Sequence, residues 1–316
     1  MSALPPLGTG GPHRAGGKGE SPRKAAQIGA IAAVALPIAA RARRVVDVGS
    51  GHGHLTRAIG ELIAQPVIGL ERDASLTVRA RSLVSSASPT FAVTDVLQCG
   101  LAVSVGDCVI GLHACGELGD VMVASVAEAG GASLVLVACC PQKRRQASRQ
   151  PLCDLVEHRP RLDLPRALLG LGNLAAGDSG VEATRPQNLA ARERRLALNR
   201  LLSDACGALR IGAEMDGLNR RAAQRDLSLL VARAFALRGL PAPRPAAIEA
   251  AAEWARAAHA RARRWSVPRA ILARVLEVYV LLDRAAYLEV RGLAVDVGVL
   301  FPAEVSPRNL ALLAQP

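Results

Sequence analysis

The sequence is poor in aromatic residues, in lysine and in regularly spaced cysteines. Aromatic residues make up 2% of the 316 residues, and only three of the 39 basic residues are lysine (Lys18, Lys24, Lys143). Binders of single-stranded nucleic acid usually stack bases on aromatic rings, so this composition disfavours generic stacking recognition. The seven cysteines do not form the dense framework of a small secreted domain. We therefore expect a cytoplasmic protein in a reducing environment.

The sequence also has no apolar run long enough to span a bilayer. Residues 27–40 (QIGAIAAVALPIAA) imitate the core of a signal peptide, but this segment is too short to span a bilayer. Cleavage there would remove a helix that we expect to pack beside the first strand. The sequence therefore predicts a soluble protein without a membrane partner.

The composition favours a packed, strongly basic domain. Apolar residues account for 50% of the chain, which is ample for a core, and the net charge is +12. Such a charge attracts polyanions such as RNA. Alanine, arginine and leucine are so abundant that a bias toward GC-rich codons also explains part of the charge, which leaves a solvated arginine surface as the alternative.

Strand and helix patterns alternate through the first half of the chain. Apolar strand patterns occur at 43–49, 66–73, 90–96, 106–116 and 132–141, and helical patterns at 54–64 and 75–87. This alternation predicts an α/β fold with a doubly wound, mostly parallel Rossmann-like sheet of seven strands.

The pattern changes after Pro141. A segment rich in Pro and Gly (150–188) precedes a helical insertion at about 189–290, and the chain ends in a predicted antiparallel hairpin with strands 294–301 and 309–315 that completes the sheet. Residues 1–20 lack apolar periodicity and are predicted to be a disordered leader. We expect one domain over 21–316 that contains the insertion.

A glycine-rich loop follows the first strand. The glycines Gly49, Gly51 and Gly53 have the spacing G-x-G-x-G, whereas a dinucleotide site has G-x-G-x-x-G. Asp47, two residues before the loop, would attract the cationic ammonium and sulfonium of S-adenosylmethionine and repel a pyrophosphate. The loop therefore favours S-adenosylmethionine as the cofactor.

Two further acids stand at the ends of the next two strands. Glu71 follows Gly53 by 18 residues, where a carboxylate accepts hydrogen bonds from the ribose hydroxyls, and Asp95 is expected to reach the adenine amino group. Each acid alone also fits a helix cap. Together with the loop they predict a cofactor site made of Asp47, Gly49, Gly51, Gly53, Glu71 and Asp95.

The chain resembles the class I S-adenosylmethionine-dependent methyltransferases, and in particular the methyltransferase-like protein 25 family over nearly its whole length. The residues that carry the resemblance are SPRK (21–24), DVGSGHGHLTR (47–57), GLHACGEL (111–118), ACCPQK (138–143), LEVYVLLDRAAYLE (276–289) and SPRNLAL (306–312). Short pieces around His113 and the cysteine pair are also similar to eukaryotic tRNA 2′-O-methyltransferases.

Two positions depart from the family pattern. His52 stands where the family more often has lysine, and Pro141 stands where an aromatic residue is common. Both lie near the expected active site, so the resemblance does not fix the substrate.

A histidine and three cysteines fall at the ends of the fourth and fifth strands, where open α/β sheets bind ligands: His113, Cys115, Cys139 and Cys140. Cys115 or Cys140 is a candidate nucleophile, and His113 is a candidate general base. The alternative is packing, with His113 bonded to a backbone carbonyl. A zinc site is disfavoured because adjacent residues of a strand, here Cys139 and Cys140, point to opposite faces.

The sequence thus predicts an S-adenosylmethionine-dependent methyltransferase whose acceptor is RNA, either tRNA or rRNA. Alternatives are a protein or small-molecule acceptor, and a non-catalytic RNA-associated or ribosome-associated scaffold with the same fold. The run Asn/Asp-Pro-Pro-aromatic, typical of many exocyclic-amine methyltransferases, is missing.

Overall fold

The structure is a computed structural model, and it describes residues 4–7, 20–84, 88–153, 162–173, 184–209 and 212–316. The chain forms two compact units, one made of residues 1–176 with 270–316 and the other of residues 177–269. None of the described helices is long and apolar enough to cross a membrane.

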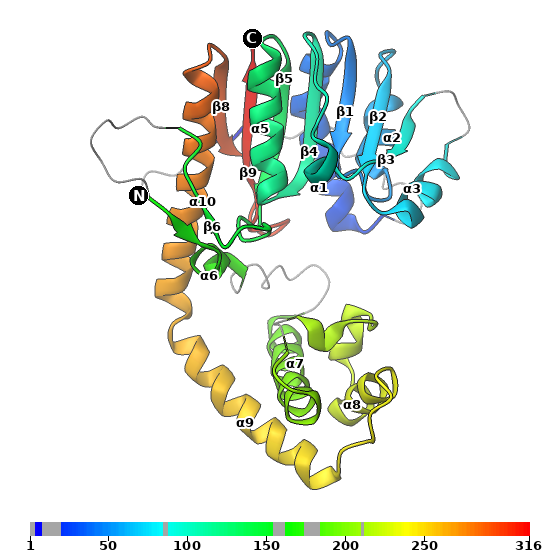
Figure 1. The fold of residues 1–316 in the computed structure, drawn as a ribbon, viewed down its shortest axis with the longest axis vertical. Coiled ribbons are helices and arrows are strands. Elements are labelled where there is room, and N and C mark those ends of the chain that lie inside the picture. The colour runs from blue at the N-terminus through cyan, green and yellow to red at the C-terminus, as the bar shows by residue number, and fades with distance from the viewer. Residues whose placement is uncertain (1–3, 8–19, 85–87, 154–161, 174–183, 210–211) are drawn as a thin grey trace. The chain divides into compact units, whose positions relative to one another are not determined.

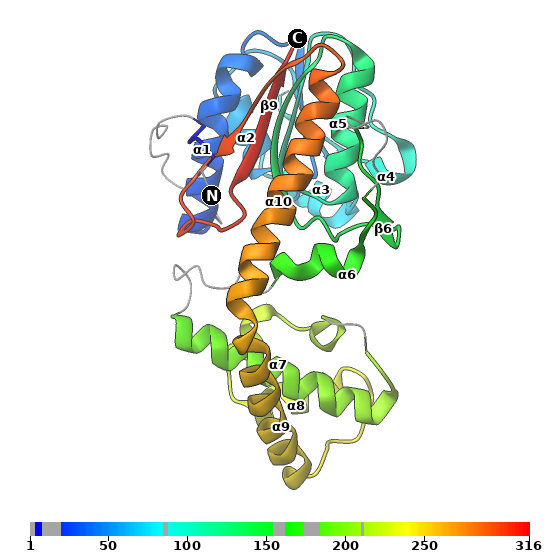
Figure 2. The same ribbon diagram turned by 90° about the vertical axis from the view of Figure 1, so that its left-hand side faces the viewer.

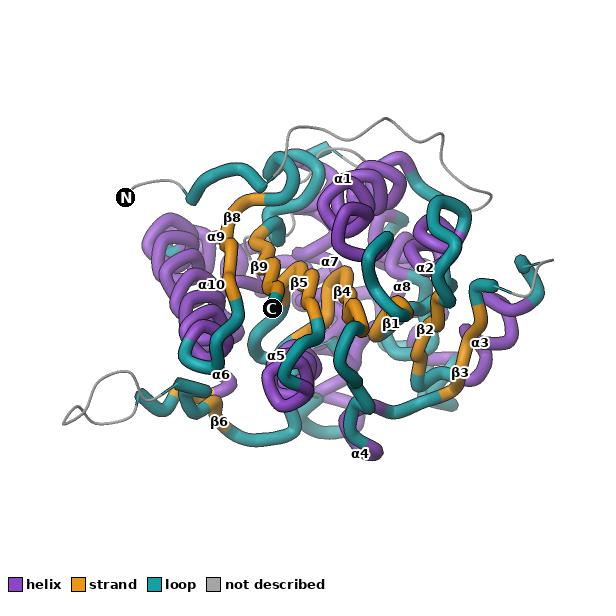
Figure 3. Tube along the Cα trace, turned by 90° about the horizontal axis from the view of Figure 1, so that it is seen from above, coloured by secondary structure: helices purple, strands orange, loops and turns teal. Residues whose placement is uncertain are grey.

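The first unit is built on a seven-stranded sheet of order β3-β2-β1-β4-β5-β9-β8, which can be followed from edge to edge in Figure 3. Its strands are β1 (Arg44–Val48), β2 (Val67–Glu71), β3 (Thr90–Val93), β4 (Asp107–Cys115), β5 (Ser133–Cys139), β8 (Ala294–Val299) and β9 (Leu310–Gln315). Strands β1 to β5 pair in parallel, whereas β9 is antiparallel to both β5 and β8. This confirms the predicted mostly parallel sheet and its terminal hairpin.

Helices cover both faces of this sheet (Figures 1 and 3). On one face, α1 (Pro22–Ala39) and α2 (His54–Gly60) bury apolar side chains against the strands, and on the other α5 (Glu117–Ala129) and α10 (Ser266–Glu289) do so. The strands between these layers are apolar on both sides, as in other covered parallel sheets. The remaining elements of this part are α3 (Ala74–Arg81), α4 (Val96–Cys99), β6 (Ser148–Arg149), β7 (Leu164–Pro165), α6 (Arg166–Leu169) and the 3-10 turn η1 (Gly170–Asn173).

Several helices begin where the sequence offers a capping side chain. The hydroxyl of Ser21 accepts from the backbone N–H of Lys24 at the start of α1, and Asp73 accepts from Ser75 and Leu76 at the start of α3. These bonds satisfy backbone donors that have no partner inside the first turn. The apolar segment 27–40 lies almost entirely within α1, whose buried face includes Ile28, Ile31 and Ala35.

The second unit is helical. It contains α7 (Arg185–Cys206), the 3-10 turns η3 (Ala213–Met215) and η4 (Arg220–Gln224), α8 (Leu227–Ala236) and α9 (Pro245–Arg264). Helix α7 contacts both α8 and α9 (Figure 2). Its own core includes Leu198, Leu202, Val231, Phe235 and Ala255. The insertion predicted at 189–290 overlaps this unit, but the part of α10 from residue 270 onward belongs to the first unit, where Leu281, Ala285 and Leu288 are in the core.

The predicted leader is only partly described, since residues 1–3 and 8–19 lie outside the described residues. Residues 4–7 run beside β8. The N–H of Val299 donates to the carbonyl of Pro5 and the N–H of Leu7 donates to the carbonyl of Val299, each at 2.9 Å. For these four residues the expectation of disorder is wrong, because they add backbone bonds to the edge strand.

Candidate functional site

The glycine loop connects β1 to α2 and has an unusual backbone. Gly49, Gly51 and Gly53 have φ values of +75°, +57° and +70°, in the left-handed region that favours glycine. A Cβ atom on Gly51 would meet no atom within 4 Å, whereas one on Gly53 would overlap the ring of Phe91. Gly51 therefore faces open space that a ligand could enter, and Gly53 allows the loop to pack against β3.

Asp47 is buried beneath this loop. Its side chain accepts a hydrogen bond from the Thr56 hydroxyl at 2.6 Å, and the residue is 2% exposed. Burial raises the pKa of Asp47 to about 6, although the Thr56 bond and the nearby charge of Lys24 oppose this shift. Burial also lowers the pKa of Lys24. Asp47 thus joins the strand to α2, and its contact with a cofactor stays a prediction.

Glu71 is the last residue of β2 and faces the glycine loop. One carboxylate oxygen accepts from the backbone N–H of Gly51 at 2.9 Å, and the other accepts from the N–H of Asp73 at 3.0 Å. The side chain is partly exposed. Glu71 therefore fixes the loop and still borders the open space at Gly51.

Asp95 follows β3 and caps α4. Its carboxylate accepts from the backbone N–H of Leu97 at 3.0 Å, and its second oxygen lies 3.6 Å from a guanidinium nitrogen of Arg145. The sequence analysis gave a helix cap as the alternative role of this acid, and the structure shows that contact. Asp95 is nevertheless partly exposed, at the same edge of the sheet as Glu71.

Sequence reasoning missed a contact between the N-terminal segment and the loop. The ring nitrogen Nδ1 of His54, the first residue of α2, lies 3.0 Å from a carboxylate oxygen of Glu20. Burial lowers the pKa of His54, while the charge of Glu20 opposes that shift. No local pattern predicts this pair, because the two residues are 34 positions apart in the sequence (54 − 20).

His113 marks an irregularity in β4. The pairing register of β4 with β5 shifts between Leu112 and Ala114, and His113 itself has φ of +67°. Bulges of this kind often re-aim side chains next to functional sites. Among the described residues, Nδ1 of His113 is buried and has no hydrogen-bond partner, which gives no support to a bond between this atom and a backbone carbonyl.

The electrostatics of His113 limit its chemistry. Burial lowers its pKa to about 4, and the charges of Lys24 and Arg308 lower it further. The ring is therefore neutral at pH 7, which lets it accept a proton but makes it a weak base. Its role as the general base stays a prediction.

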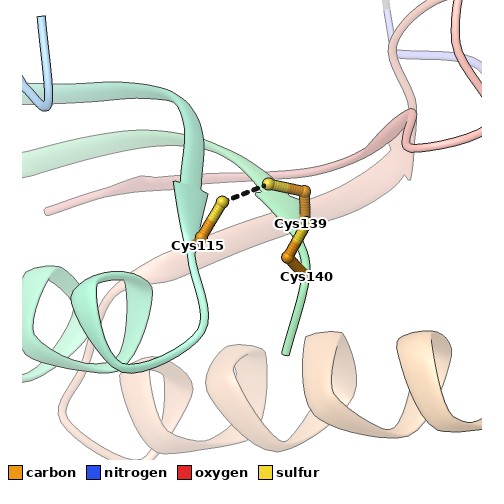
Figure 4. Close-up of side chains that lie close together, drawn as sticks. All are labelled: Cys115, Cys139 and Cys140. Atoms are coloured by element: carbon orange, nitrogen blue, oxygen red, sulfur yellow. Dashed lines mark hydrogen bonds between the residues drawn. The ribbon is translucent and has the colours of Figure 1, made fainter. Parts of the chain in front are cut away.

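Cys115, Cys139 and Cys140 converge at the ends of β4 and β5 (Figure 4). Their three sulfur atoms lie within 4.8 Å of one another, and the sulfurs of Cys115 and Cys139 are 3.0 Å apart. The expectation that Cys139 and Cys140 point to opposite faces is wrong. Cys140 lies beyond the last residue of β5 with φ of +44°, so strand alternation no longer applies to it.

The three thiols do not ionise alike. Hydrogen bonds with Cys115 and Cys139 lower the pKa of Cys140 to about 2, and the charges of Arg308 and Lys143 lower it further. Hydrogen bonds with Cys115 and Cys140, together with burial, raise the pKa of Cys139. The thiol of Cys140 is therefore the most acidic of the three, and its role as a nucleophile stays a prediction.

A small open cavity adjoins the cysteines. It is lined by residues of β5, α10 and β9 and of the segments that follow β5 and precede β9. Among them are Cys139, Pro141, Glu277 and Arg308. Burial raises the pKa of Glu277, and Arg274 donates to its carboxylate at 3.2 Å. Sequence reasoning gave Glu277 no role, although an acid within an otherwise apolar helical segment was a signal.

A buried ionic network supports the cysteine-bearing edge. Asp120 on α5 accepts from Arg149 at 3.1 Å and from Arg284 at 2.9 Å, and Arg149 also donates to Asp283 at 2.6 Å. Arg284 donates to the carbonyl of Gly116, the residue after Cys115. Burial alone would raise the pKa of Asp120, but the two guanidinium groups hold it below its usual value. The network thus ties α10 to the end of β4.

The chain is similar to several known methyltransferases. Residues 23–147 match a family model described as "Methyltransferase domain". Solved structures that are similar include a magnesium protoporphyrin IX methyltransferase from Synechocystis with bound SAH (23% identity, 34% of this chain and 51% of that chain, TM-score 0.28). A 23S rRNA methyltransferase (23%, 34% and 44%, TM-score 0.28) and an SAM-bound amino pentose methyltransferase from Micromonospora echinaspora (22%, 42% and 59%, TM-score 0.30) are also similar.

These likenesses cover only part of each chain. The alignment spans about half the length of the solved structures that the chain resembles. Because their acceptors are a porphyrin, an rRNA and a sugar, they do not decide the acceptor of this chain. Residues 23–147, which are less than half of the chain, are similar to a methyltransferase domain, the class of enzyme predicted from the sequence.

Proposed function

We propose that this methyltransferase domain binds S-adenosylmethionine at the β1–α2 loop and transfers its methyl group to RNA. The main support for the cofactor site is the conformation of the loop. Gly51 faces open space, and its backbone N–H donates to the Glu71 carboxylate. The partly exposed carboxylates of Glu71 and Asp95 end neighbouring strands at one edge of the sheet. This is the edge where open α/β sheets bind their ligands.

The cofactor residues have distinct proposed roles. The open space at Gly51 leaves room for the amino-acid part of S-adenosylmethionine beside Gly49, and buried Asp47 supplies negative charge beneath it. Glu71 accepts from the ribose hydroxyls, and Asp95 accepts from the adenine amino group. When bound, S-adenosylmethionine supplies the electrophilic methyl group. His113, Cys115 and Cys140 then lie on the acceptor side, where positioning contributes much of the rate.

The finer resemblance to the methyltransferase-like protein 25 family is also part of the proposal. Segments that carry it contact one another although they lie far apart in the chain. Arg23 of the first segment donates to the Ser306 hydroxyl of the last at 3.3 Å. Arg284 reaches the carbonyl of Gly116 at 2.8 Å. These contacts support the view that the quoted segments form one connected structure around the strand ends.

The RNA acceptor is proposed from charge. The chain carries a net charge of +12, and the last turns of α9 expose Arg256, Arg261, Arg263 and Arg264. Guanidinium groups bind phosphates in a bidentate manner and suit a structured RNA read through its backbone. A protein or small-molecule acceptor with a merely solvated arginine surface is the competing proposal, and a non-catalytic RNA-associated scaffold is the third.

Calorimetry with S-adenosylmethionine and S-adenosylhomocysteine tests the cofactor site. We expect Glu71→Ala to weaken binding by about 1.5–3 kcal/mol, because two hydrogen bonds to a charged group are lost. The matched control is Glu128→Ala, which removes an exposed acid from the last turn of α5 and should bind like the wild type. Unchanged affinity of Glu71→Ala would show that the wrong acid was chosen, and no binding by the wild type at millimolar cofactor would favour the scaffold.

Transfer of label tests the acceptor. The protein and labelled S-adenosylmethionine are incubated with lysate from a strain that lacks the gene, and parallel samples are treated with ribonuclease or protease. We expect ribonuclease to remove the label. Label that survives ribonuclease and is lost to protease would refute the RNA acceptor while leaving the cofactor site intact.

Salt dependence tests the proposed phosphate contacts. Replacing the four α9 arginines by glutamine should make the plot of log affinity for RNA against log salt less steep by about 3, since each phosphate contact contributes roughly 0.7–0.9 to the slope. The variant should keep its affinity for S-adenosylmethionine, which controls for folding of the first unit. An unchanged slope would remove α9 from the proposed interface.

A further inference from the structure

The three sulfur atoms of Cys115, Cys139 and Cys140 form a compact group that the cofactor site does not use. All three lie within 4.8 Å of one another (Figure 4). A tetrahedral ion about 2.3 Å from each sulfur would place the sulfurs roughly 3.8 Å apart. The observed 3.0 Å between Cys115 and Cys139 would have to open by under 1 Å, and no separation within the group would have to close by more than about 1 Å. Side-chain rotations supply shifts of this size.

The backbone at both strand ends brings the sulfurs together. The bulge at His113 alters the register of β4 just before Cys115, so that Cys115 pairs directly with Cys139. Cys140 adopts a left-handed φ of +44°, a conformation that is strained for a non-glycine residue. Strain of this kind persists where the surroundings enforce it and is concentrated at functional sites. Without it, strand alternation would point Cys140 away from Cys139.

The surroundings fit bound thiolates. Cys139 is 7% exposed and Cys140 is 6% exposed, so three anionic sulfurs there need compensating positive charge. The charges of Arg308 and Lys143 act on Cys140, and Lys143 acts also on Cys115. A divalent ion would supply most of the remaining charge. Sulfur ligands in a tetrahedral arrangement select zinc over the harder magnesium and calcium ions.

We infer that Cys115, Cys139 and Cys140 bind one zinc ion as a three-thiolate site, a role that replaces the nucleophile role of Cys115 or Cys140. No further His, Cys, Asp or Glu atom joins the group among the described residues, so solvent takes the fourth position of a tetrahedral ion. The cavity lined by Cys139, Pro141, Glu277 and Arg308 adjoins the site and gives such a solvent molecule access. The inference stands on the cysteine geometry and does not depend on the identity of the methyl acceptor.

Zinc titration of the reduced, chelator-stripped full-length protein tests this site. Competition with a chromophoric chelator should give one zinc per chain, and cobalt in its place should give the intense sulfur-to-metal absorption of thiolate ligation. Each of Cys115→Ser, Cys139→Ser and Cys140→Ser should weaken zinc binding by at least about 10–100-fold, the loss that changes even outside the ligand shell produce. The exposed cysteines supply the matched controls, Cys99→Ser and Cys206→Ser, which should bind like the wild type.

Thiol protection tests the same site without any substitution. Zinc should protect Cys115, Cys139 and Cys140 of the wild type from alkylation, as read by mass spectrometry of the digested protein, and leave Cys99 and Cys206 reactive. Absence of protection in the fully reduced chain would overturn the inference. So would full zinc affinity in Cys140→Ser, or a chain that binds no zinc but forms a Cys115–Cys139 disulfide on mild oxidation.

Discussion

The buried carboxyl group of Asp47 makes the stability of the first unit depend on pH in an unusual direction. Its pKa is about 6 in the folded protein, mainly because of burial, against 3.8 for the free group. The groups that face it are the Thr56 hydroxyl on α2, Lys24 on α1 and Glu71 on β2. Between these two pKa values the folded chain binds more protons than the unfolded chain. The stability therefore falls as the pH rises through this range.

The magnitude is set by the difference in pKa. A shift of about two units at 1.36 kcal/mol per unit corresponds to roughly 3 kcal/mol. This cost is fully present above about pH 6 and is removed as the pH falls toward 4. In Asp47→Asn the group no longer titrates. The free energy of unfolding of the variant minus that of the wild type should therefore rise by about 2.5 kcal/mol between pH 4 and pH 7, whatever constant effect the amide itself has.

Urea unfolding at a series of pH values measures this difference. Hydrogen exchange of peptides from β1 assigns the transition to the first unit, and carbon NMR of the carboxyl group reports the pKa of Asp47 directly. The control is Asp73→Asn, because hydrogen bonds from Ser75 and Leu76 lower the pKa of this exposed acid. Its stabilising contribution is lost as the pH falls below about 3.8, so the control should be nearly constant between pH 4 and pH 7 and show the opposite slope below that range. A difference for Asp47→Asn that is constant with pH, or that falls toward pH 7, would refute the reasoning.

Two further predictions concern packing. Gly53→Ala should destabilise the first unit by about 2–5 kcal/mol, because left-handed φ costs about 1–2 kcal/mol and the overlap with Phe91 costs about 1–3. In Gly51→Ala the new Cβ has open space around it, so this variant should lose only the stability that the left-handed φ costs. Equal losses of unfolding free energy for the two variants, measured by urea unfolding, would contradict this. Deletion of residues 307–316 removes β9 from between β5 and β8 and should prevent folding of the first unit, and native-like circular dichroism with cooperative melting would oppose this expectation.

Much of the fold was predictable because it is encoded in short segments. Apolar runs such as 45–48 and 134–137 are buried strands, and the intervening helices start beside local capping residues such as Asp73. Glycines at alternate positions in 49–53 could be assigned to a ligand loop, since left-handed turns are open mainly to glycine. These signals act within a few residues, so one sequence is enough to detect them.

The detailed contacts of the site were not predictable in this way. Asp47 was expected at the cofactor, yet its visible partners are Thr56 and the charge of Lys24. Glu20 contacts His54, and Glu277 lines the cavity beside the cysteines. Each of these partners belongs to an element packed from elsewhere in the chain. From residue type alone, several residues could have been the contact partner of each of these side chains.

The sequence by itself determined the alternating elements, the doubly wound sheet and the class of the glycine loop, because hydrophobic period and glycine spacing are local properties. Only the tertiary structure decided which side chains meet at the strand ends. Arg149 reaches Asp283 across 134 positions, and Cys115 reaches Cys139 across 24. The bulge at His113 and the left-handed Cys140 reverse the alternation that the strand pattern implies. Such departures arise where tertiary packing stabilises a backbone conformation that the local sequence disfavours. Short-range sequence patterns carry no information about tertiary packing, so they do not predict these departures.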